Sequence, residues 1–255
     1  MKIRIIDRSK CEECTSILCT FKRETILPNY YSLRSESTVC PVGYLNQKPI
    51  TLVEDNYLDT SKCINCCLCV GDCIMDNLTY EDYEYNAVFD NLSGLQYNAI
   101  ALSYLHKIFG FAANTNRNGS IDFDGYFQLP SKNFEGFVEV DYYNDSLESC
   151  RRLLGDFLTY RGQLSEEVNY GLIVLKDFPS ETSRDVYYLI KRIKEFPKTC
   201  NKEIGITTFS LLRKLALISQ NIIAPKELFF DPTKETLSDY KHRIAATYDI
   251  DDNLI

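Results

Sequence analysis

The sequence has 255 residues, of which 45% are hydrophobic and 25% are charged, as in an ordinary globular protein. A formal charge of −8, from 28 Lys and Arg against 36 Asp and Glu, argues against indiscriminate coating of nucleic acid, which needs many cations. No window approaches the roughly 20 unbroken apolar residues of a membrane span, and MKIRIIDRSK lacks the apolar core of a signal peptide. We therefore expect a cytoplasmic protein with no membrane partner.

Cysteine usage changes along the chain and predicts two domains. Nine of the eleven cysteines lie in the first third, and only Cys150 and Cys200 come later. The acidic, Tyr-rich run TYEDYEYN follows the cysteine-rich part and ends at residue 86. We expect one domain over residues 1–86 and a second over residues 87–255. In a cytosolic chain of this size, clustered cysteines more often bind a metal or a cluster than form disulfides.

The stretch KCINCCLCVGDC has the spacing C-x-x-C-x-x-C-x-x-x-C at Cys63, Cys66, Cys69 and Cys73. Three thiolates on one tight loop can reach three irons of a single cube, while the fourth points toward another cluster. A tetrahedral zinc site usually takes two C-x-x-C knuckles from separate loops. The additional C-x-x-C step within one loop therefore favours an iron–sulfur cluster over zinc or free buried thiols.

An internal repeat accompanies this spacing, because DRSKCEEC at residues 7–14 returns as DTSKCINC at residues 59–66. The first copy is followed by Cys19 and then by Cys40-Pro41, so each copy has four cysteines. The first third of the chain thereby resembles the bacterial two-cluster 4Fe–4S ferredoxins, which implies a ferredoxin-like domain with two 4Fe–4S clusters. It departs from that family in a longer step from Cys14 to Cys19, about twenty residues inserted before Cys40, and no Pro after Cys73.

The resemblance also implies that ligands cross over between the two copies. One cluster would take Cys11, Cys14, Cys19 and Cys73, and the other would take Cys63, Cys66, Cys69 and Cys40. Cys67 would be a spare thiol at a position where the family often has Gly.

The remaining chain alternates between helical and strand periodicity. We expect a helix over residues 92–111, strands over 119–129 and 136–144, a helix over 146–160, a strand over 171–178, a helix over 184–196, and a strand from 203 that runs into a helix. This order indicates an α/β layer with a mixed sheet, and the whole chain is of the α+β or α/β class.

Four carboxylates fall on two of these expected strands. Asp122 and Asp124 are two residues apart, as are Glu139 and Asp141, so each pair shares a face of its strand. If the strands form a hairpin, the four like charges crowd one patch, and Mg²⁺ or Mn²⁺ would relieve their repulsion. Such a metal could activate water for phosphodiester hydrolysis.

The order of helix, Asp-bearing strand, Glu-bearing strand, helix and strand resembles the PD-(D/E)xK nucleases, the restriction-endonuclease-like superfamily. The resemblance implies that Asp122 or Asp124 is the metal-binding Asp and Glu139 the following Glu, all within a DNA-cleaving site. Asp141 stands where the family usually has Lys, and Lys176 is a candidate for a displaced cation.

Other interpretations of these residues remain open. NTNRNGSIDFDG is similar to a calcium loop, although Gly125 stands where the final bidentate Glu belongs. The carboxylates are also compatible with a solvated strand face. Basic residues that could contact phosphates, or form a solvated helix face, are Lys191, Arg192, Lys194, Lys198 and Lys202.

Two functions follow from these patterns. The first is an iron–sulfur protein with a metal-dependent nuclease-like domain, in which Asp122, Asp124, Glu139 and Asp141 are catalytic and the partner is DNA. The second is a ferredoxin-type electron-transfer protein whose C-terminal domain is a catalytically inactive docking module for a redox partner protein.

Overall fold

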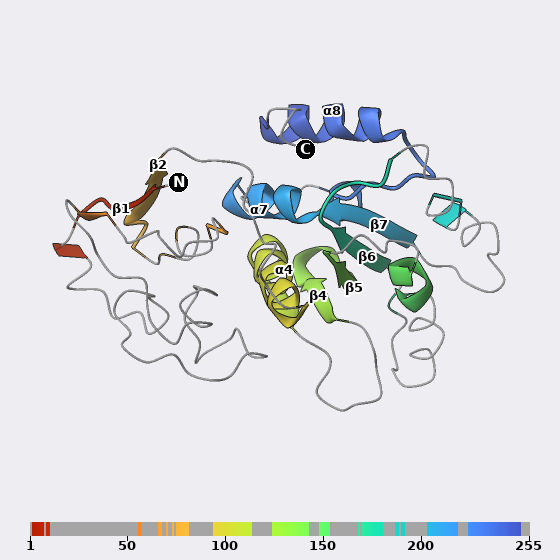
Figure 1. The fold of residues 1–255 in the computed structure, drawn as a ribbon, viewed down its shortest axis with the longest axis horizontal. Coiled ribbons are helices and arrows are strands. Elements are labelled where there is room, and N and C mark those ends of the chain that lie inside the picture. The colour runs from red at the N-terminus through yellow and green to blue at the C-terminus, as the bar shows by residue number, and fades with distance from the viewer. Residues whose placement is uncertain are drawn as a thin grey trace. The chain divides into compact units, whose positions relative to one another are not determined.

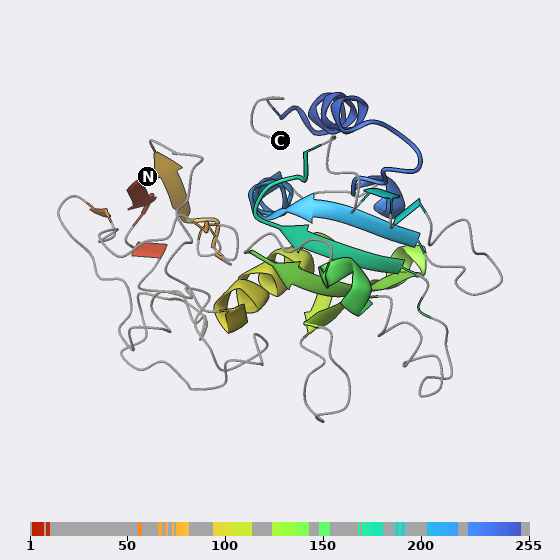
Figure 2. The ribbon, with the colours of Figure 1, turned by 45° about the vertical axis from the view of Figure 1, so that its right-hand side comes forward.

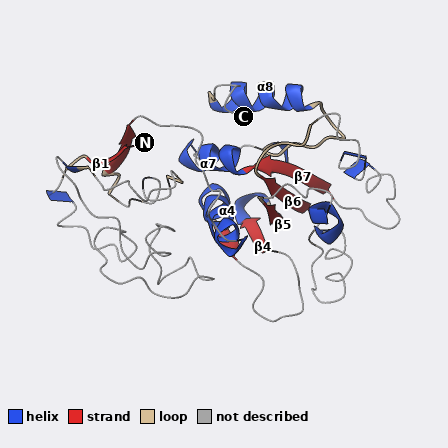
Figure 3. Cartoon of the chain, in the orientation of Figure 1, coloured by secondary structure: helices blue, strands red, loops and turns tan. Residues whose placement is uncertain are grey.

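The chain divides into two compact units, Met1–Ser103 and Tyr104–Ile255, in a computed structural model. Its described residues are 2–7, 9–10, 56–57, 66–67, 70, 73, 75–81, 94–113, 124–142, 148–153, 168, 170–180, 187–188, 190–191, 203–218 and 224–250 (Figures 1 and 3). The predicted domain boundary after residue 86 lies outside these residues. Within them, no helix has the length and apolar character that crossing a membrane requires.

The first unit contains an antiparallel pair of strands, β1 (Lys2–Ile5) and β2 (Leu78–Glu81). Ile3 and Ile5 are buried while Arg4 between them is exposed, which is the alternation of a half-buried strand. β1 leads into the first cysteine motif, and β2 follows the last cysteine of the second. Their pairing therefore brings the start of one copy close to the end of the other.

The second unit is built on a five-stranded mixed sheet, which confirms the predicted mixed sheet flanked by helices. The strands, in spatial order, are β3 (Phe111–Ala113), β4 (Gly125–Leu129), β5 (Phe134–Asp141), β6 (Tyr170–Leu175) and β7 (Glu203–Thr208). The first three are antiparallel neighbours, whereas β5, β6 and β7 run parallel, side by side in Figure 2. The condition set for crowding the carboxylates, a hairpin between the two segments, is met by β4 and β5, which are joined by the short 3-10 helix η2 (Pro130–Lys132).

Helices precede, connect and follow these strands. α4 (Gly94–Phe109) comes before the sheet, residues 148–153 are helical between β5 and β6, and residues 187–188 and 190–191 are helical between β6 and β7. α7 (Phe209–Ile218) continues directly from β7, as the sequence predicts. The strand β3 and the helix α8 (Leu237–Tyr248), which follows the 3-10 helix η3 (Pro225–Glu227), were not predicted.

Aromatic side chains form much of the core of the second unit. Phe109 stacks on Phe127 at 5.0 Å between ring centroids. Tyr170 meets Phe134 edge to face at 5.0 Å and lies tilted against Phe229 at 6.1 Å. All five rings are buried. Such pairs add to the stabilisation that area burial alone provides, so this cluster fixes the sheet that carries the candidate carboxylates.

Candidate functional site

Three of the cysteines predicted to bind a cluster, or to lie beside one, are described. Cys66 and Cys67 are buried, and Cys73 is half-buried. Six predicted ligands lie outside the described residues, namely Cys11, Cys14, Cys19, Cys40, Cys63 and Cys69. The structural information on this site therefore comes from the residues around Cys67 and Cys73.

Cys67 has a left-handed backbone, with φ of 60°. Residues with a Cβ are uncommon in this region and Gly adopts it without steric cost. The amide of Val70 donates to the carbonyl of Cys67 at 3.2 Å and closes a tight turn within the cysteine loop. This backbone conformation explains why a Gly would suit the position. Cys67 is thus the residue at which the chain reverses after Cys66.

The Cys73 sulfur accepts a hydrogen bond from the backbone amide of Asn77 at 3.3 Å. The amide of Asp76 donates to the Cys73 carbonyl at 2.9 Å, so a single turn holds both the sulfur and the carbonyl of Cys73. Hydrogen bonds to the sulfurs of ligating cysteines are one of the means by which proteins tune iron–sulfur clusters. The Cys73 sulfur already receives such a bond from the chain itself.

The side chain of Asn77 links this turn to the beginning of the first cysteine motif. Its Nδ2 donates to the carbonyl of Asp7 at 2.6 Å, and its Oδ1 accepts from the amide of Asp7 at 2.9 Å. The amide of Ile6 also donates to the Asn77 carbonyl at 2.9 Å, and Asn77 is fully buried. Asp7 stands four residues before Cys11, so these contacts tie the start of the first motif to Cys73 at the end of the second.

Asp7 itself organises the first motif. Its Oδ1 accepts from the amide of Ser9 at 2.9 Å and from the hydroxyl of Ser9 at 2.7 Å. These two hydrogen bonds from Ser9 lower the pKa of the Asp7 carboxyl. Ser9 and Lys10 are helical, so the D-x-S-K signature begins a helical turn that leads toward Cys11. The second copy of the signature, at residues 59–62, lies outside the described residues.

The hairpin brings two of the predicted carboxylates together. Gly125 pairs with Val138, so Asp124, one residue earlier, lies next to Glu139, one residue later. The prediction that Asp124 belongs to the strand is wrong, because Asp124 forms a bend and β4 begins at Gly125. The reason is a side-chain contact, since Asp124 Oδ2 accepts from the amide of Val140 at 2.8 Å. Asp122 lies outside the described residues.

Glu139 and Asp141 share one face of β5, as predicted from their spacing. Glu139 is buried, with 2% of its surface exposed, whereas Asp141 at the end of the strand is half-buried. The hydroxyl of Ser149, from the helical residues after β5, donates to Asp141 Oδ2 at 2.9 Å. This bond orients the Asp141 carboxylate at the end of β5.

Lys176 reaches the same edge of the sheet. Asp141, the last residue of β5, pairs with Leu175, the last residue of β6. The next residue of each strand, Tyr142 and Lys176, therefore lies at the same edge of the sheet. The Lys176 ammonium lies 5.1 Å from the centroid of the Tyr142 ring. The carboxyl ends of parallel strands are where ligands bind in open α/β sheets, and this edge carries Asp141, Ser149 and Lys176.

Part of the predicted chemistry rests on residues that the structure leaves undescribed. In the described ranges, no group of three or more His, Cys, Asp or Glu side chains is arranged to hold a metal ion. Of the calcium-like loop at residues 114–125, the first ten residues fall outside those ranges. Of the five basic residues expected to contact phosphates, only Lys191 is described, and it is exposed. The other four lie outside the described residues, namely Arg192, Lys194, Lys198 and Lys202.

Sequence reasoning missed two residues that organise these sites. Asn77 gave no signal, because an amide four residues after a cysteine belongs to no motif and its partner Asp7 is 70 residues away. Ser149 was read as part of a helix, and only the fold shows that it faces Asp141. No family model, curated protein or solved structure matches the chain.

Proposed function

We propose that this chain is an iron–sulfur protein whose first unit binds two 4Fe–4S clusters and whose second unit is a divalent-metal-dependent, nuclease-like domain. One cluster would be held by Cys11, Cys14, Cys19 and Cys73, and the other by Cys63, Cys66, Cys69 and Cys40. When bound, such clusters accept and release single electrons. The observation that carries the proposal is the Asn77 contact set, which links the start of the first motif to the sulfur of Cys73.

Three properties of the described residues support cluster binding. Cys73 receives an amide hydrogen bond on sulfur, a contact of the kind that tunes cluster ligands. The left-handed Cys67 turns the loop between two proposed ligands, and Cys66 is buried. The third is the pair of hydrogen bonds between Asp7 and Asn77, which joins the start of the first motif to the end of the second and so supports ligands shared between the copies.

Replacing Cys73 by Ala tests the cluster part of the proposal. We expect anaerobically purified Cys73→Ala to contain about half the iron and sulfide of the wild type, because one of two clusters loses its fourth thiolate. Cys150→Ala is the matched control. Burial raises the pKa of the Cys150 thiol to about 12, so it stays protonated and is unfit as a ligand. Equal iron content in wild type and Cys73→Ala would contradict the assignment of Cys73.

A specific observation also favours the nuclease-like activity, namely the position of Asp124 beside Glu139 with Asp141 and Lys176 at the same edge of the sheet. Asp124, Glu139 and Asp141, together with Asp122, would hold Mg²⁺ or Mn²⁺, which would supply an activated water. Ser149 would hold the Asp141 carboxylate in place, and Lys176 would offer a cation to the phosphate.

The isosteric variant Glu139→Gln tests this activity. We expect it to reduce Mn²⁺-dependent cleavage of single- and double-stranded DNA by about 100-fold or more, with unchanged cluster absorbance. Asp177→Asn is the control, because Asp177 is an exposed carboxylate just after β6. Circular dichroism of both variants checks that the buried substitution leaves the fold intact. Cleavage by neither the wild type nor the variant, with reversible reduction by a ferredoxin reductase, would instead support the electron-transfer function.

A further inference from the structure

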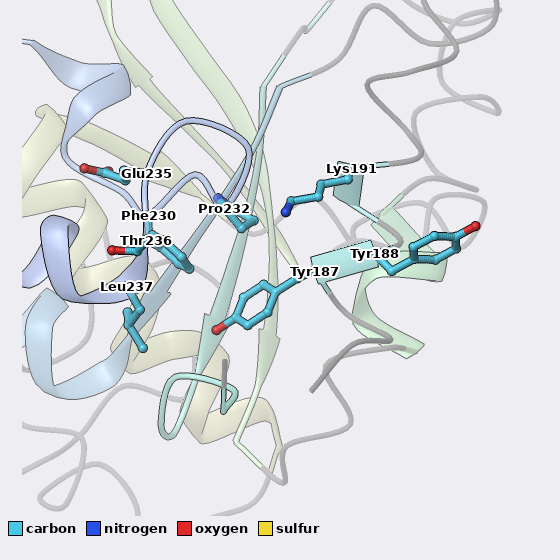
Figure 4. Close-up of a pocket in the computed structure, with 8 residues that line it drawn as sticks. All are labelled: Tyr187, Tyr188, Lys191, Phe230, Pro232, Glu235, Thr236 and Leu237. Carbon is cyan, nitrogen blue, oxygen red and sulfur yellow. The ribbon is translucent and has the colours of Figure 1, made fainter. Parts of the chain in front are cut away.

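The second unit contains a cavity that the proposed function does not use. It has a volume of about 410 Å³ and lies between Tyr187, Tyr188 and Lys191 on one side and the segment from Phe230 to the start of α8 on the other (Figure 4). Cavities that bind small molecules commonly measure about 300–1,000 Å³. The cavity is therefore large enough for a ligand of more than one functional group.

Two aromatic rings form a fixed wall of this cavity. Tyr187 and Phe230 meet at 5.8 Å between centroids with an interplanar angle of 86°, so they form a corner. The Tyr187 hydroxyl donates to the Pro179 carbonyl at 2.6 Å, and Phe230 is buried against Phe178 and Tyr240 at 6.0 and 5.4 Å. Both rings are thus oriented before any ligand binds. A planar ring placed in this corner would stack on one ring and meet the edge of the other, and both arrangements are favourable.

Among the described residues around the cavity, Lys191 offers a cation to a ligand. The Glu235 carboxylate accepts from Arg243 Nε at 3.0 Å and Nη2 at 2.6 Å, and this pairing raises the pKa of the Arg243 guanidinium. Lys234 is likewise paired with Asp231 at 3.2 Å. Among the described residues, no carboxylate lies within ion-pairing distance of Lys191, which is exposed. Its ammonium points toward Pro232 and Phe230 in Figure 4, so the cavity favours an anionic group beside an aromatic one.

The aromatic corner and the Lys191 ammonium together define the ligand. The Glu235 carboxylate is held by the Arg243 fork and points away from Tyr187 and Lys191 in Figure 4. A ligand that matches the two features has a planar ring and an anionic group. A nucleoside phosphate combines them, with its base in the aromatic corner and its phosphate at Lys191.

We propose that this cavity binds a nucleoside monophosphate, either free or as the terminal unit of a single strand. The proposal uses none of the cluster cysteines or β4–β5 carboxylates, so it stands or fails separately from the proposed function. Isothermal titration of the full chain with AMP tests it, with adenosine and inorganic phosphate as truncated ligands. We expect AMP to bind at least about 10-fold more tightly than either, because each lacks one of the two main contacts.

Lys191→Ala assigns the phosphate contact. We expect this exposed substitution to weaken AMP binding about 10-fold while leaving adenosine binding unchanged. Lys132→Ala is the charge control because it removes another exposed lysine of the same unit. This control should not change AMP binding.

A single-stranded adenine trinucleotide distinguishes the two sources of the ligand. Binding more than about 10-fold tighter than that of AMP assigns the cavity to the end of a strand, and equal or weaker binding assigns it to a free nucleotide. Both results support the shared chemistry. The absence of AMP binding at millimolar concentration, binding of inorganic phosphate as tight as that of AMP, or an unchanged affinity in Lys191→Ala would overturn the proposal.

Discussion

Replacing Asn77 by alanine is expected to shorten the lifetime of the cluster absorbance in the presence of an iron chelator about 10-fold. The substitution removes two side-chain hydrogen bonds, at 2.6 and 2.9 Å, that hold the carbonyl and the amide of Asp7. Losing the partner of a buried polar group costs about 1–3 kcal/mol. The tie between the first cysteine motif and Cys73 would loosen, and the cluster shared between them would be released more readily.

Two further variants make the Asn77 result specific. Asp76→Asn changes the exposed neighbour in the same turn and should leave the lifetime unchanged. Asn77→Asp keeps the acceptor for the Asp7 amide but loses the donor to the Asp7 carbonyl, so its lifetime should be intermediate. The role of Asn77 is refuted if Asn77→Ala and the wild type release iron at the same rate.

Gly205→Ala is expected to lower the free energy of unfolding of the second unit by about 3 kcal/mol, the upper part of the usual range for overpacking. Gly205 pairs with Leu172 in the centre of the parallel strands. A Cβ at this position would overlap the Tyr170 hydroxyl and lie 2.8 Å from Phe229 Cβ. Tyr170 cannot move aside easily, since its ring is buried and packs against Phe134 and Phe229. Urea unfolding followed by tyrosine fluorescence measures the change.

Gly110→Ala provides the contrasting substitution. Gly110 has a φ of 84° with no neighbouring atom within 4 Å of an added Cβ, so backbone strain would be the main cost. We expect a loss of about 1 kcal/mol. Unfolding of Gly205→Ala at the same urea concentration as the wild type would contradict the close packing of Tyr170 against Gly205 of β7.

Hydrophobic periodicity predicted most of the second unit because its elements are long or strongly apolar. β6 is buried at every residue, and the run from β7 into α7 is buried on nearly all positions, so both gave clear patterns. β3 has only three residues, too few for a period to show. α8 buries only Tyr240, Ile244 and Ala245, so its apolar stripe is weak. Its start did carry a usable signal, since Thr236 caps the helix and exchanges hydrogen bonds with Asp239.

The candidate sites were predictable in residue type but not in their contacts. The spacing of Glu139 and Asp141 was enough to place them on one face, whereas alternation indicated two strands and left their pairing as a hairpin to the structure. Alternation also extended the strand through Asp124, because a pattern cannot show that the side chain bonds the Val140 amide. The tie from Asp7 to Asn77 depends on a pairing over 70 residues, which no local pattern encodes.

The iron and acid-labile sulfide content of the anaerobically purified wild-type chain, measured with its visible spectrum, tests the central claim most directly. Two 4Fe–4S clusters predict about eight iron and eight sulfide per chain and a broad absorbance near 400 nm that falls on reduction with dithionite. Stoichiometric zinc without sulfide, and a spectrum without visible absorbance, would contradict the cluster assignment and leave the repeated cysteines as a zinc site.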